Sequence, residues 1–290
     1  MLGFINVFKP AGATSAQTVA RVRRIYTFYK RDRTLAVGHL GTLDPQAAGV
    51  LPVAVGKATR LIPLLADHRK AYVCTLVLGR STTTADATGT TLESRTVPEN
   101  WLSRLREAIP RFVGAIEQVP PMFSAVHHNG KRLYQLAREG KTVERKKRRT
   151  TIYALTVLGV ESGVARLRIT CSEGTYVRTL CEDLGSAMDL PAHMGALLRE
   201  ASGPFVLYES LTMEEIAHDP RAAMIAPENV IPFPTVVLDL RCSADFRAGR
   251  MVPLPAGAAA KHVFVRDASR TLVGVGEPIG ALLAPRKVFV

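Results

Sequence analysis

The sequence predicts an α+β protein that ends in a small all-β module. Two apolar runs, 152–160 and 164–171, flank a Ser-Gly pair and predict a β-hairpin. Apolar side chains recur at helical spacing before and after this hairpin, at 98–112 and 179–188. Beyond residue 234 the chain holds only short β-like runs separated by Gly and Pro. Hairpin and helices together indicate the α+β body, and the tail indicates the second module.

The N-terminal part is expected to hold a strand at 4–8 and a helix at 16–26. Thr14 and Ser15 are typical capping residues for that helix, which carries apolar side chains at helical spacing. Basic and aromatic residues alternate through 23–33, a mixture that suits phosphate contact and base stacking. An exposed basic loop is an equally good interpretation of this segment alone.

The middle of the chain predicts a strand at 72–78, followed by a loop rich in Thr and Gly at 81–91. The amphipathic helix at 98–112 carries Trp101, the single Trp, which we expect in the core. Six Lys and Arg side chains crowd into 141–149, a run too charged to pack in a core, so it is expected at the surface.

The tail is expected to begin after a linker at 231–234, whose sequence Ile-Pro-Phe-Pro resists regular structure. Its predicted strands are short, at 236–240, 262–265, 272–275 and 287–290.

Charge predicts a polyanionic partner. The 290 residues include 38 Lys and Arg against 25 Asp and Glu, a formal net charge of +13. An excess of this size is typical of proteins that bind nucleic acid.

Composition also argues against several other classes. No apolar stretch approaches the roughly 18 residues of a membrane span, and the start of the chain lacks the features of a signal peptide. The four cysteines, Cys74, Cys171, Cys181 and Cys242, show no metal-ligand spacing and are expected to be free thiols in a reducing compartment. The sequence therefore predicts a cytoplasmic protein without a metal.

The most informative motif is Gly-His-Leu-Gly-Thr-Leu-Asp-Pro at 38–45. Its two glycines allow backbone to approach a bulky ligand. Pro45 fixes a turn and keeps Asp44 out of the helical region, so a short carboxylate is held at a stiff corner. Taken alone, Asp-Pro is more often an ordinary turn or helix start.

This motif, with others along the chain, resembles the family of bacterial tRNA pseudouridine-55 synthases. Matching stretches follow in order from Lys9-Pro10, through 38–60, Tyr72, 118–125, 130–134, 171–178 and 183–185, to 197–205. The resemblance implies a pseudouridine-synthase fold with a mixed, largely antiparallel sheet flanked by helices. It divides the chain into a catalytic domain at 1–233, with an RNA-binding insertion at about 123–150, and a PUA-like RNA-binding domain at 234–290.

The implied reaction isomerises one uridine in the TΨC loop of tRNA without a cofactor. The base is flipped out, detached at N1, rotated and rejoined through C5. Breaking a glycosidic bond creates positive character at the anomeric carbon, which an aligned carboxylate can capture or stabilise. The resemblance assigns this carboxylate to Asp44, and attack on the ribose and addition to the base both stay open.

The resemblance also assigns the other site residues. Arg178 would pair with Asp44 in a bidentate contact, and Tyr72 would stack on the base and help to move a proton. His39 would fill the space that the flipped uridine leaves. The remaining substrate-binding residues are Lys9, Asp86, Tyr176, Leu197 and Arg199. Three have a plainer interpretation: Asp86 as a turn former, Tyr72 as core, and Arg178 as a surface ion pair. For Tyr176 and Leu197, packing in the core and contact with the substrate coincide.

Three departures from the family pattern bear on docking. The loop before Gly38 is longer and more basic, Thr83 and Thr88 stand where acids are common, and Glu200 follows Arg199 in place of Thr or Leu. We therefore expect the chemistry to match the family more closely than the details of tRNA docking.

Two rival hypotheses remain beside a monomeric enzyme that modifies the TΨC stem-loop without an obligate protein partner. One is a related synthase directed by a guide RNA and accessory proteins. The other is a tRNA-binding folding chaperone in which catalysis is secondary.

Overall fold

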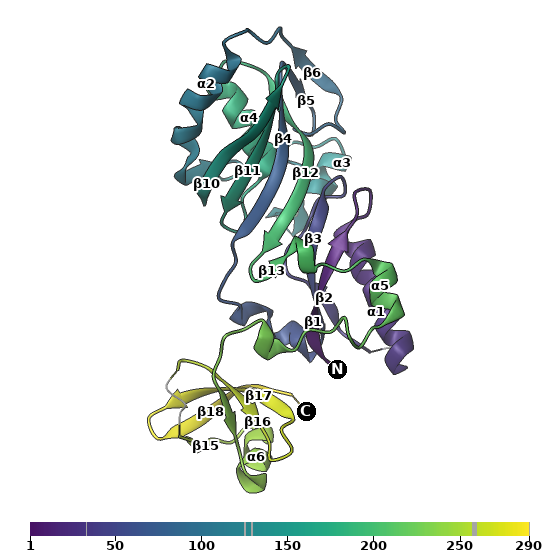
Figure 1. Ribbon diagram of the computed structural model, residues 1–290, viewed down its shortest axis with the longest axis vertical. Coiled ribbons are helices and arrows are strands. Elements are labelled where there is room, and N and C mark those ends of the chain that lie inside the picture. The colour runs from purple at the N-terminus through teal and green to yellow at the C-terminus, as the bar shows by residue number, and fades with distance from the viewer. Residues whose placement is uncertain (33, 125, 129, 257–259, 290) are drawn as a thin grey trace.

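The computed structural model describes residues 1–32, 34–124, 126–128, 130–256 and 260–289. The molecule is elongated, with a large sheet and its helices in one part and a small sheet near the C-terminus in the other (Figure 1). No described helix is both long enough and apolar enough to cross a membrane.

The large sheet is mixed and largely antiparallel, as the family resemblance implies. Its strand order is β1-β3-β12-β4-β11-β10-β7, with β2 beside β3 and β13 beside β12. Among the described strands of this sheet, β12 and β3 pair in parallel and the other pairs are antiparallel. The strands are β1 (Leu2–Lys9), β2 (Val37–His39), β3 (Ala48–Gly56), β4 (Lys70–Leu78), β7 (Gly114–Gln118), β10 (Arg148–Glu161), β11 (Val164–Cys171), β12 (Ala192–Ser202) and β13 (Phe205–Val206).

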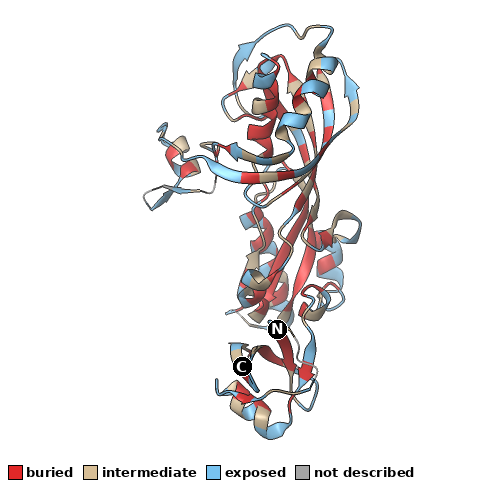
Figure 2. Ribbon diagram, turned by 90° about the vertical axis from the view of Figure 1, so that its left-hand side faces the viewer, coloured by how far each residue is buried: buried red, intermediate tan, exposed pale blue. Residues whose placement is uncertain are grey.

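Helices pack beside this sheet, and its strands carry many of the buried residues (Figure 2). The helical elements are α1 (Ser15–Lys30), η1 (Lys57–Leu64), α2 (Trp101–Ala108), η2 (Ile109–Phe112), α4 (Val177–Ala187), η3 (Leu207–Glu209), α5 (Met213–His218) and η4 (Pro227–Asn229). Thr14 caps α1 by accepting a hydrogen bond from the Gln17 amide, as predicted. The helix runs four residues beyond the predicted end, with no further buried side chain, and ends at its C-cap Arg31, which has a left-handed φ of 54°; Arg33 lies outside the described residues.

The predicted hairpin is confirmed by β10 and β11, with Ser162 and Gly163 at positive φ in the turn. The strands β3 and β12 are absent from our prediction. Residues of β3 are buried on both faces, so they lack the polar–apolar alternation that marks a half-exposed strand. A small hairpin of β5 (Arg80–Thr82) and β6 (Thr91–Ser94) flanks the predicted threonine-rich loop.

The predicted insertion at 123–150 holds little structure of its own. It contains β8 (His127–His128), β9 (Lys131–Arg132) and the short helix α3 (Leu133–Arg138), while residues 125 and 129 lie outside the described part. The basic run at 141–149 is largely exposed, as expected.

The tail forms a five-stranded sheet, which agrees with the PUA-like module that the sequence predicts. Its strands are β14 (Thr235–Val237), β15 (Val252–Pro253), β16 (Val263–Arg266), β17 (Leu272–Ile279) and β18 (Leu282–Val288). Our prediction misses one helix here, α6 (Leu240–Arg247), which Asp239 caps through the Cys242 amide at 2.7 Å. Val290, at the end of the last predicted strand, lies outside the described residues.

The predicted linker at 231–234 is packed rather than extended in solvent. Ile231 is fully buried, and the Phe233 ring lies 5.4 Å from that of Phe264 in the small sheet. Phe264 belongs to the same apolar cluster as Phe4 of the large sheet. The two sheets are therefore joined by a shared core.

Gly49 marks the one place where the parallel pairing of β3 and β12 demands glycine. It has φ +111°, and a Cβ there would lie 2.3 Å from the Arg199 carbonyl oxygen. Gly114 has a similar φ of +100° but no atom within 4 Å of its Cβ position. We expect Gly49→Ala to lower the free energy of unfolding by at least about 2 kcal/mol more than Gly114→Ala, measured by urea denaturation. Equal losses would show that the close approach is not a constraint.

Candidate active site

A cavity of about 280 Å³ opens where the loop at 40–44 meets the strands β4 and β12 and the start of α4. It collects six of the nine residues that the sequence analysis assigned to the site, namely Asp44, Tyr72, Tyr176, Arg178, Leu197 and Arg199. These residues come from four separate stretches of the chain. The fold thus brings together what the sequence places up to 155 positions apart, counting from Asp44 to Arg199.

The Asp44 loop is held rigid by its own turn and by α1. The Ala47 amide donates to the Asp44 carbonyl at 3.1 Å, which is the turn that Pro45 predicts. The Ser15 hydroxyl donates to the Leu43 carbonyl at 2.8 Å and accepts from the Leu43 amide at 2.9 Å. The first residue of α1 therefore fixes the position directly before Asp44.

Two buried cationic side chains, Arg199 and Lys9, hold the backbone of the same loop through hydrogen bonds. Arg199 donates to the carbonyls of Gly41 and Thr42, both at 3.2 Å, and to Val50 at 2.6 Å. Lys9 donates to the carbonyls of Pro10, Ala13 and Pro45 at 2.7–3.2 Å. Lys9 has no exposed surface. The structure thus places Lys9 behind the loop, where it positions Asp44 and does not reach the cavity.

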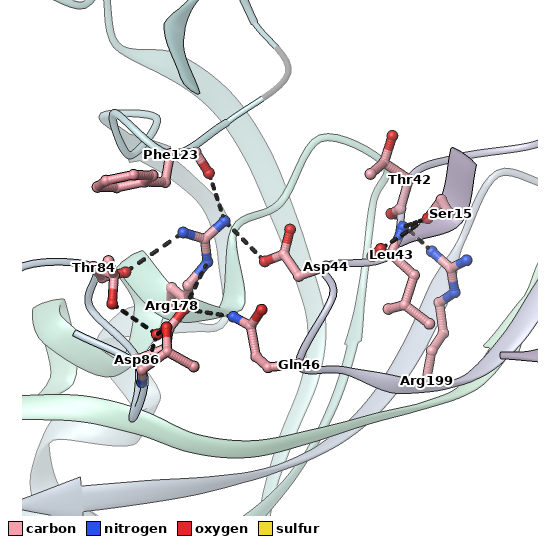
Figure 3. A network of polar contacts seen from close by, with 11 residues as sticks. Ser15, Thr42, Leu43, Asp44, Gln46, Thr84, Asp86, Phe123, Arg178 and Arg199 are labelled. Carbon is pink, nitrogen blue, oxygen red and sulfur yellow. Dashed lines mark hydrogen bonds and ion pairs between the residues drawn. The ribbon is translucent and has the colours of Figure 1, made fainter. Parts of the chain in front are cut away.

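Arg178 joins the two acidic side chains of the site (Figure 3). Its Nη2 lies 2.8 Å from Asp44 Oδ2, and its Nε lies 4.0 Å from Asp86 Oδ2. Nη2 also donates to the Phe123 carbonyl at 2.9 Å, and Nη1 donates to the Thr84 carbonyl at 3.4 Å. The guanidinium therefore contacts Asp44 through one nitrogen and bridges several other partners, where a bidentate pair with Asp44 was expected. Such bridging fixes both the side chain and its partners.

Asp86 lies behind Arg178 and is almost fully buried. Its Oδ1 accepts from the hydroxyls of Thr84 and Thr88 at 2.7 and 2.5 Å, and from the Thr88 amide at 3.0 Å. Gln46, two residues after Asp44, donates to its Oδ2. Asp86 thus shapes its own loop, as the plainer interpretation holds, and also supports Arg178. It has no place in the cavity lining.

Tyr72 lines the cavity from the central strand β4 and is buried. Burial raises the pKa of its phenol, and the charge and hydrogen bond of Arg199 offset this only in part. The phenol therefore stays protonated at neutral pH, so that its O–H is available as a proton donor.

The remaining predicted residues line the wall or the rim. Tyr176 is the N-cap residue of α4; the Gln118 side chain accepts a hydrogen bond from its amide at 3.0 Å and donates one to its carbonyl at 3.2 Å. Leu197 lies beside an irregularity in the pairing of β12 with β4 and is buried. His39 ends β2, one residue before the lining residue Leu40, and burial lowers its pKa. Its neutral ring is suited to an apolar contact.

Lys70 and Glu173 also line the cavity, and neither is among the predicted site residues. Lys70 is buried and donates to the Ser202 hydroxyl at 2.6 Å. Its position two residues before Tyr72 on one strand puts both side chains on the same face, a signal that the alternation of β4 already carries. Burial lowers the pKa of Lys70 to about 8.

This lowered pKa predicts how stability depends on pH. Between pH 8 and the unfolded value of 10.5, folded Lys70 is neutral while the unfolded chain still binds the proton, so folding becomes more favourable as pH rises. Lys70→Met lacks this gain. We expect the stability of the wild type relative to Lys70→Met to rise by about 1–2 kcal/mol from pH 7 to 9.5, in urea denaturation. The exposed Lys147→Met serves as the control, and a constant difference for Lys70 would contradict the prediction.

The arrangement is suited to chemistry on a neutral ring held beside a carboxylate. The Asp44 side chain is 31% exposed and faces the cavity, while its partner Arg178 is only 5% exposed. Apolar walls and the Tyr72 ring can hold a planar base, and buried cations surround it. Among the described residues, no group of three or more His, Cys, Asp or Glu side chains could hold a metal ion.

Comparison with family models gives two adjoining matches. Residues 25–177 match the TruB family pseudouridylate synthase N-terminal domain. Residues 178–226 match the tRNA pseudouridylate synthase B C-terminal domain.

Similar proteins and structures agree with this result. The chain is 39% identical over 299 residues to tRNA pseudouridine synthase B of Burkholderia pseudomallei strain 668, covering 99% of this chain and 97% of that protein. It is 42% identical over 246 residues to tRNA pseudouridine synthase B of Halalkalibacterium halodurans, covering 83% and 79%. A solved Cbf5–Nop10–Gar1 complex contains a chain with a TM-score of 0.69 at 28% identity, covering 99% of this chain and 85% of that one.

Proposed function

The chain belongs to the TruB family of pseudouridylate synthases, and we propose that it converts uridine 55 in the TΨC loop of tRNA to pseudouridine. The observation that carries this proposal is the partly exposed Asp44 carboxylate, held by Arg178 at 2.8 Å on the wall of a cavity that Tyr72 also lines. The relatives named tRNA pseudouridine synthase B support a tRNA substrate.

In the proposed mechanism, the target uridine leaves its stack and enters the cavity. Extrusion costs a few kcal/mol, and His39 at the rim fills the vacated space. The bond between ribose C1′ and N1 breaks with the help of Asp44, the uracil turns, and C1′ bonds to C5 instead. The C5 proton is lost and N1 gains one, so the atoms balance without a cofactor. Tyr72 stacks on the base and serves in this proton transfer, and Tyr176 and Leu197 confine the ring.

The two buried cationic residues that contact the Asp44 loop are proposed to position the carboxylate. Arg199 and Lys9 hold the backbone of the Asp44 loop, so the carboxylate does not need to be ordered when the substrate arrives. Asp86 lies 4.0 Å from Arg178 Nε and helps to hold the guanidinium that contacts Asp44.

We further propose that catalysis resides in residues 1–233 and that residues 234–290 act as a PUA-like RNA-binding domain. The insertion at about 123–150 would contact the RNA on a further side. Ser124, near the start of the insertion, lines the cavity, and the basic run at 141–149 is exposed. We propose a monomer that needs no partner protein and works in the cytoplasm, where free thiols such as Cys74 and Cys171 stay reduced.

The test is site mapping on an unmodified full-length tRNA transcript with purified protein alone. We expect one pseudouridine, at position 55, detected by chemical derivatisation and primer extension. A transcript with cytidine at position 55 should stay unmodified. Modification at another uridine would contradict position 55 as the target but would still support pseudouridine formation by this protein.

Two other outcomes would favour the rival hypotheses. The solved Cbf5 complexes contain further proteins, so activity that appears only after addition of a guide RNA and partner proteins would indicate a directed synthase. Binding and refolding of tRNA without any modification would indicate a folding chaperone.

A further inference from the structure

A second groove lies along α1, away from the cavity. It encloses about 1390 Å³ between the second half of α1 and the chain around α5. Its lining includes Arg24, Phe28 and Arg31 from one side and His218 and Pro220 from the other. We call this surface the α1 groove. The proposed reaction makes no use of it.

Phe28 is the most exposed large apolar side chain in the described structure, at 88%. The reason is its place on the helix. Tyr26 is buried and donates through its hydroxyl to the Pro220 carbonyl at 2.6 Å, so its side of α1 faces the body. Phe28 follows two residues later, more than half a turn around the helix, and therefore points away. Tyr29, the next residue, also lines the groove and is 41% exposed, so the groove presents two neighbouring aromatic rings rather than one isolated apolar side chain.

Cations flank this ring on the same side of the helix. Arg24 precedes Phe28 by four residues, one helical turn, and Arg31 follows at the C-terminal cap. Both are exposed. Among the described residues, the ion pairs within 4 Å include Arg21 with Glu214 but neither Arg24 nor Arg31. The groove thus presents unneutralised guanidinium groups around an exposed ring, an arrangement that stacks a nucleobase and holds the adjoining phosphates.

The α1 groove is connected to the active site through the helix itself. Ser15, the first residue of α1, bonds to Leu43 beside Asp44. Phe28 follows Ser15 by 13 residues, so at 1.5 Å per residue it lies about 20 Å along the helix from that contact. An RNA held at Asp44 needs to extend well beyond its reactive loop to reach Phe28. A full-length tRNA has that extent.

We propose that the α1 groove is a second contact for tRNA, in which Phe28 stacks on one unpaired base outside the T arm and Arg24 and Arg31 hold the adjoining phosphates. The inference rests on the proposed function, since it takes the substrate to be tRNA. The consequence is a preference for full-length tRNA over the isolated T-arm stem-loop.

The test compares Phe28→Ala and the double variant Arg24→Glu/Arg31→Glu with the wild type on two RNAs, an unmodified full-length tRNA transcript and an isolated T-arm stem-loop. We expect Phe28→Ala to raise the Kd for full-length tRNA about tenfold. The double variant should reduce the salt slope of that binding by about 2. The Kd for the stem-loop, and kcat at saturating tRNA, should stay within twofold of the wild type.

Controls separate this proposal from general effects. Leu92→Ala truncates another exposed apolar side chain, 67% exposed on β6, and Arg106→Glu reverses an exposed charge on α2; both should leave full-length binding unchanged. Equal losses on both RNAs, or no loss on either, would overturn the proposal. If the wild type modifies neither RNA, the proposed function fails, and the two Kd values still decide whether the groove binds tRNA outside the T arm.

Discussion

Replacing Asp44 by asparagine is expected to abolish turnover and to leave tRNA binding nearly intact. Asparagine keeps the shape of the side chain, and its oxygen can still accept from Arg178 at the 2.8 Å contact. It cannot supply a negative charge to a developing cation at ribose C1′. We expect kcat to fall by at least about 10⁴-fold, measured in single-turnover assays on full-length tRNA.

The structure explains why this variant should fold normally. The loop around Asp44 is held through its backbone by Ser15, Lys9 and Arg199, none of which bonds to the Asp44 side chain in the contacts described above. The melting temperature and the Kd for tRNA should therefore match the wild type closely. Loss of activity together with loss of binding would point to a collapsed site instead.

Glu173→Gln provides the matched control, because Glu173 is a second carboxylate that lines the same cavity. It removes one negative charge without touching Asp44. We expect its kcat to change by less than about tenfold. If both variants lost activity equally, the charge of the cavity rather than the Asp44 carboxylate would control the reaction. Retained turnover in Asp44→Asn would remove Asp44 from the chemistry.

Local patterns predicted the fold best where one face of an element is exposed. The hairpin of β10 and β11 has alternating polar and apolar residues and a Ser-Gly turn, and it formed as expected. The strand β3 is buried on both faces and has no polar–apolar alternation that could be detected. The short helix α6 depends on one cap, Asp239, in a segment rich in short β-like runs. Periodicity thus detects an element that has one buried and one exposed face, and it fails for an element that is buried on both faces.

The site shows a similar division. The motif at 38–45 predicted a rigid turn that presents Asp44, and the turn is present. The residues that make it rigid, Arg199 and Lys9, were assigned to substrate by resemblance, yet their donors are used on backbone carbonyls. Such bonds join segments that are distant in sequence, so no spacing reveals them. Lys70 was missed because the strand was predicted to begin at Tyr72, so the alternation that places Lys70 on the same face as Tyr72 was not extended to it.

Arg178→Met is expected to cost both stability and activity, for two separable reasons. Arg178 is 5% exposed and contacts Asp44, which is partly exposed, and Asp86, which is 3% exposed. Removing it leaves Asp86 buried without its cationic neighbour, so the free energy of unfolding should fall by about 3–5 kcal/mol in urea denaturation. It also frees Asp44 to turn into solvent, so kcat should fall by about 10²–10³-fold.

The double variant Arg178→Met/Asp86→Asn separates these two effects. Asparagine can still accept from Thr84 and Thr88 but carries no charge, so about 2 kcal/mol of stability should return. Activity should not return, because Asp44 still lacks its partner. Arg168→Met is the control: its ion pair with Glu200 is exposed, and its loss should cost less than about 1 kcal/mol. If activity returned together with stability, Arg178 would act on the reaction only by holding the fold, and the pairing of Arg178 with Asp44 would have no direct part in catalysis.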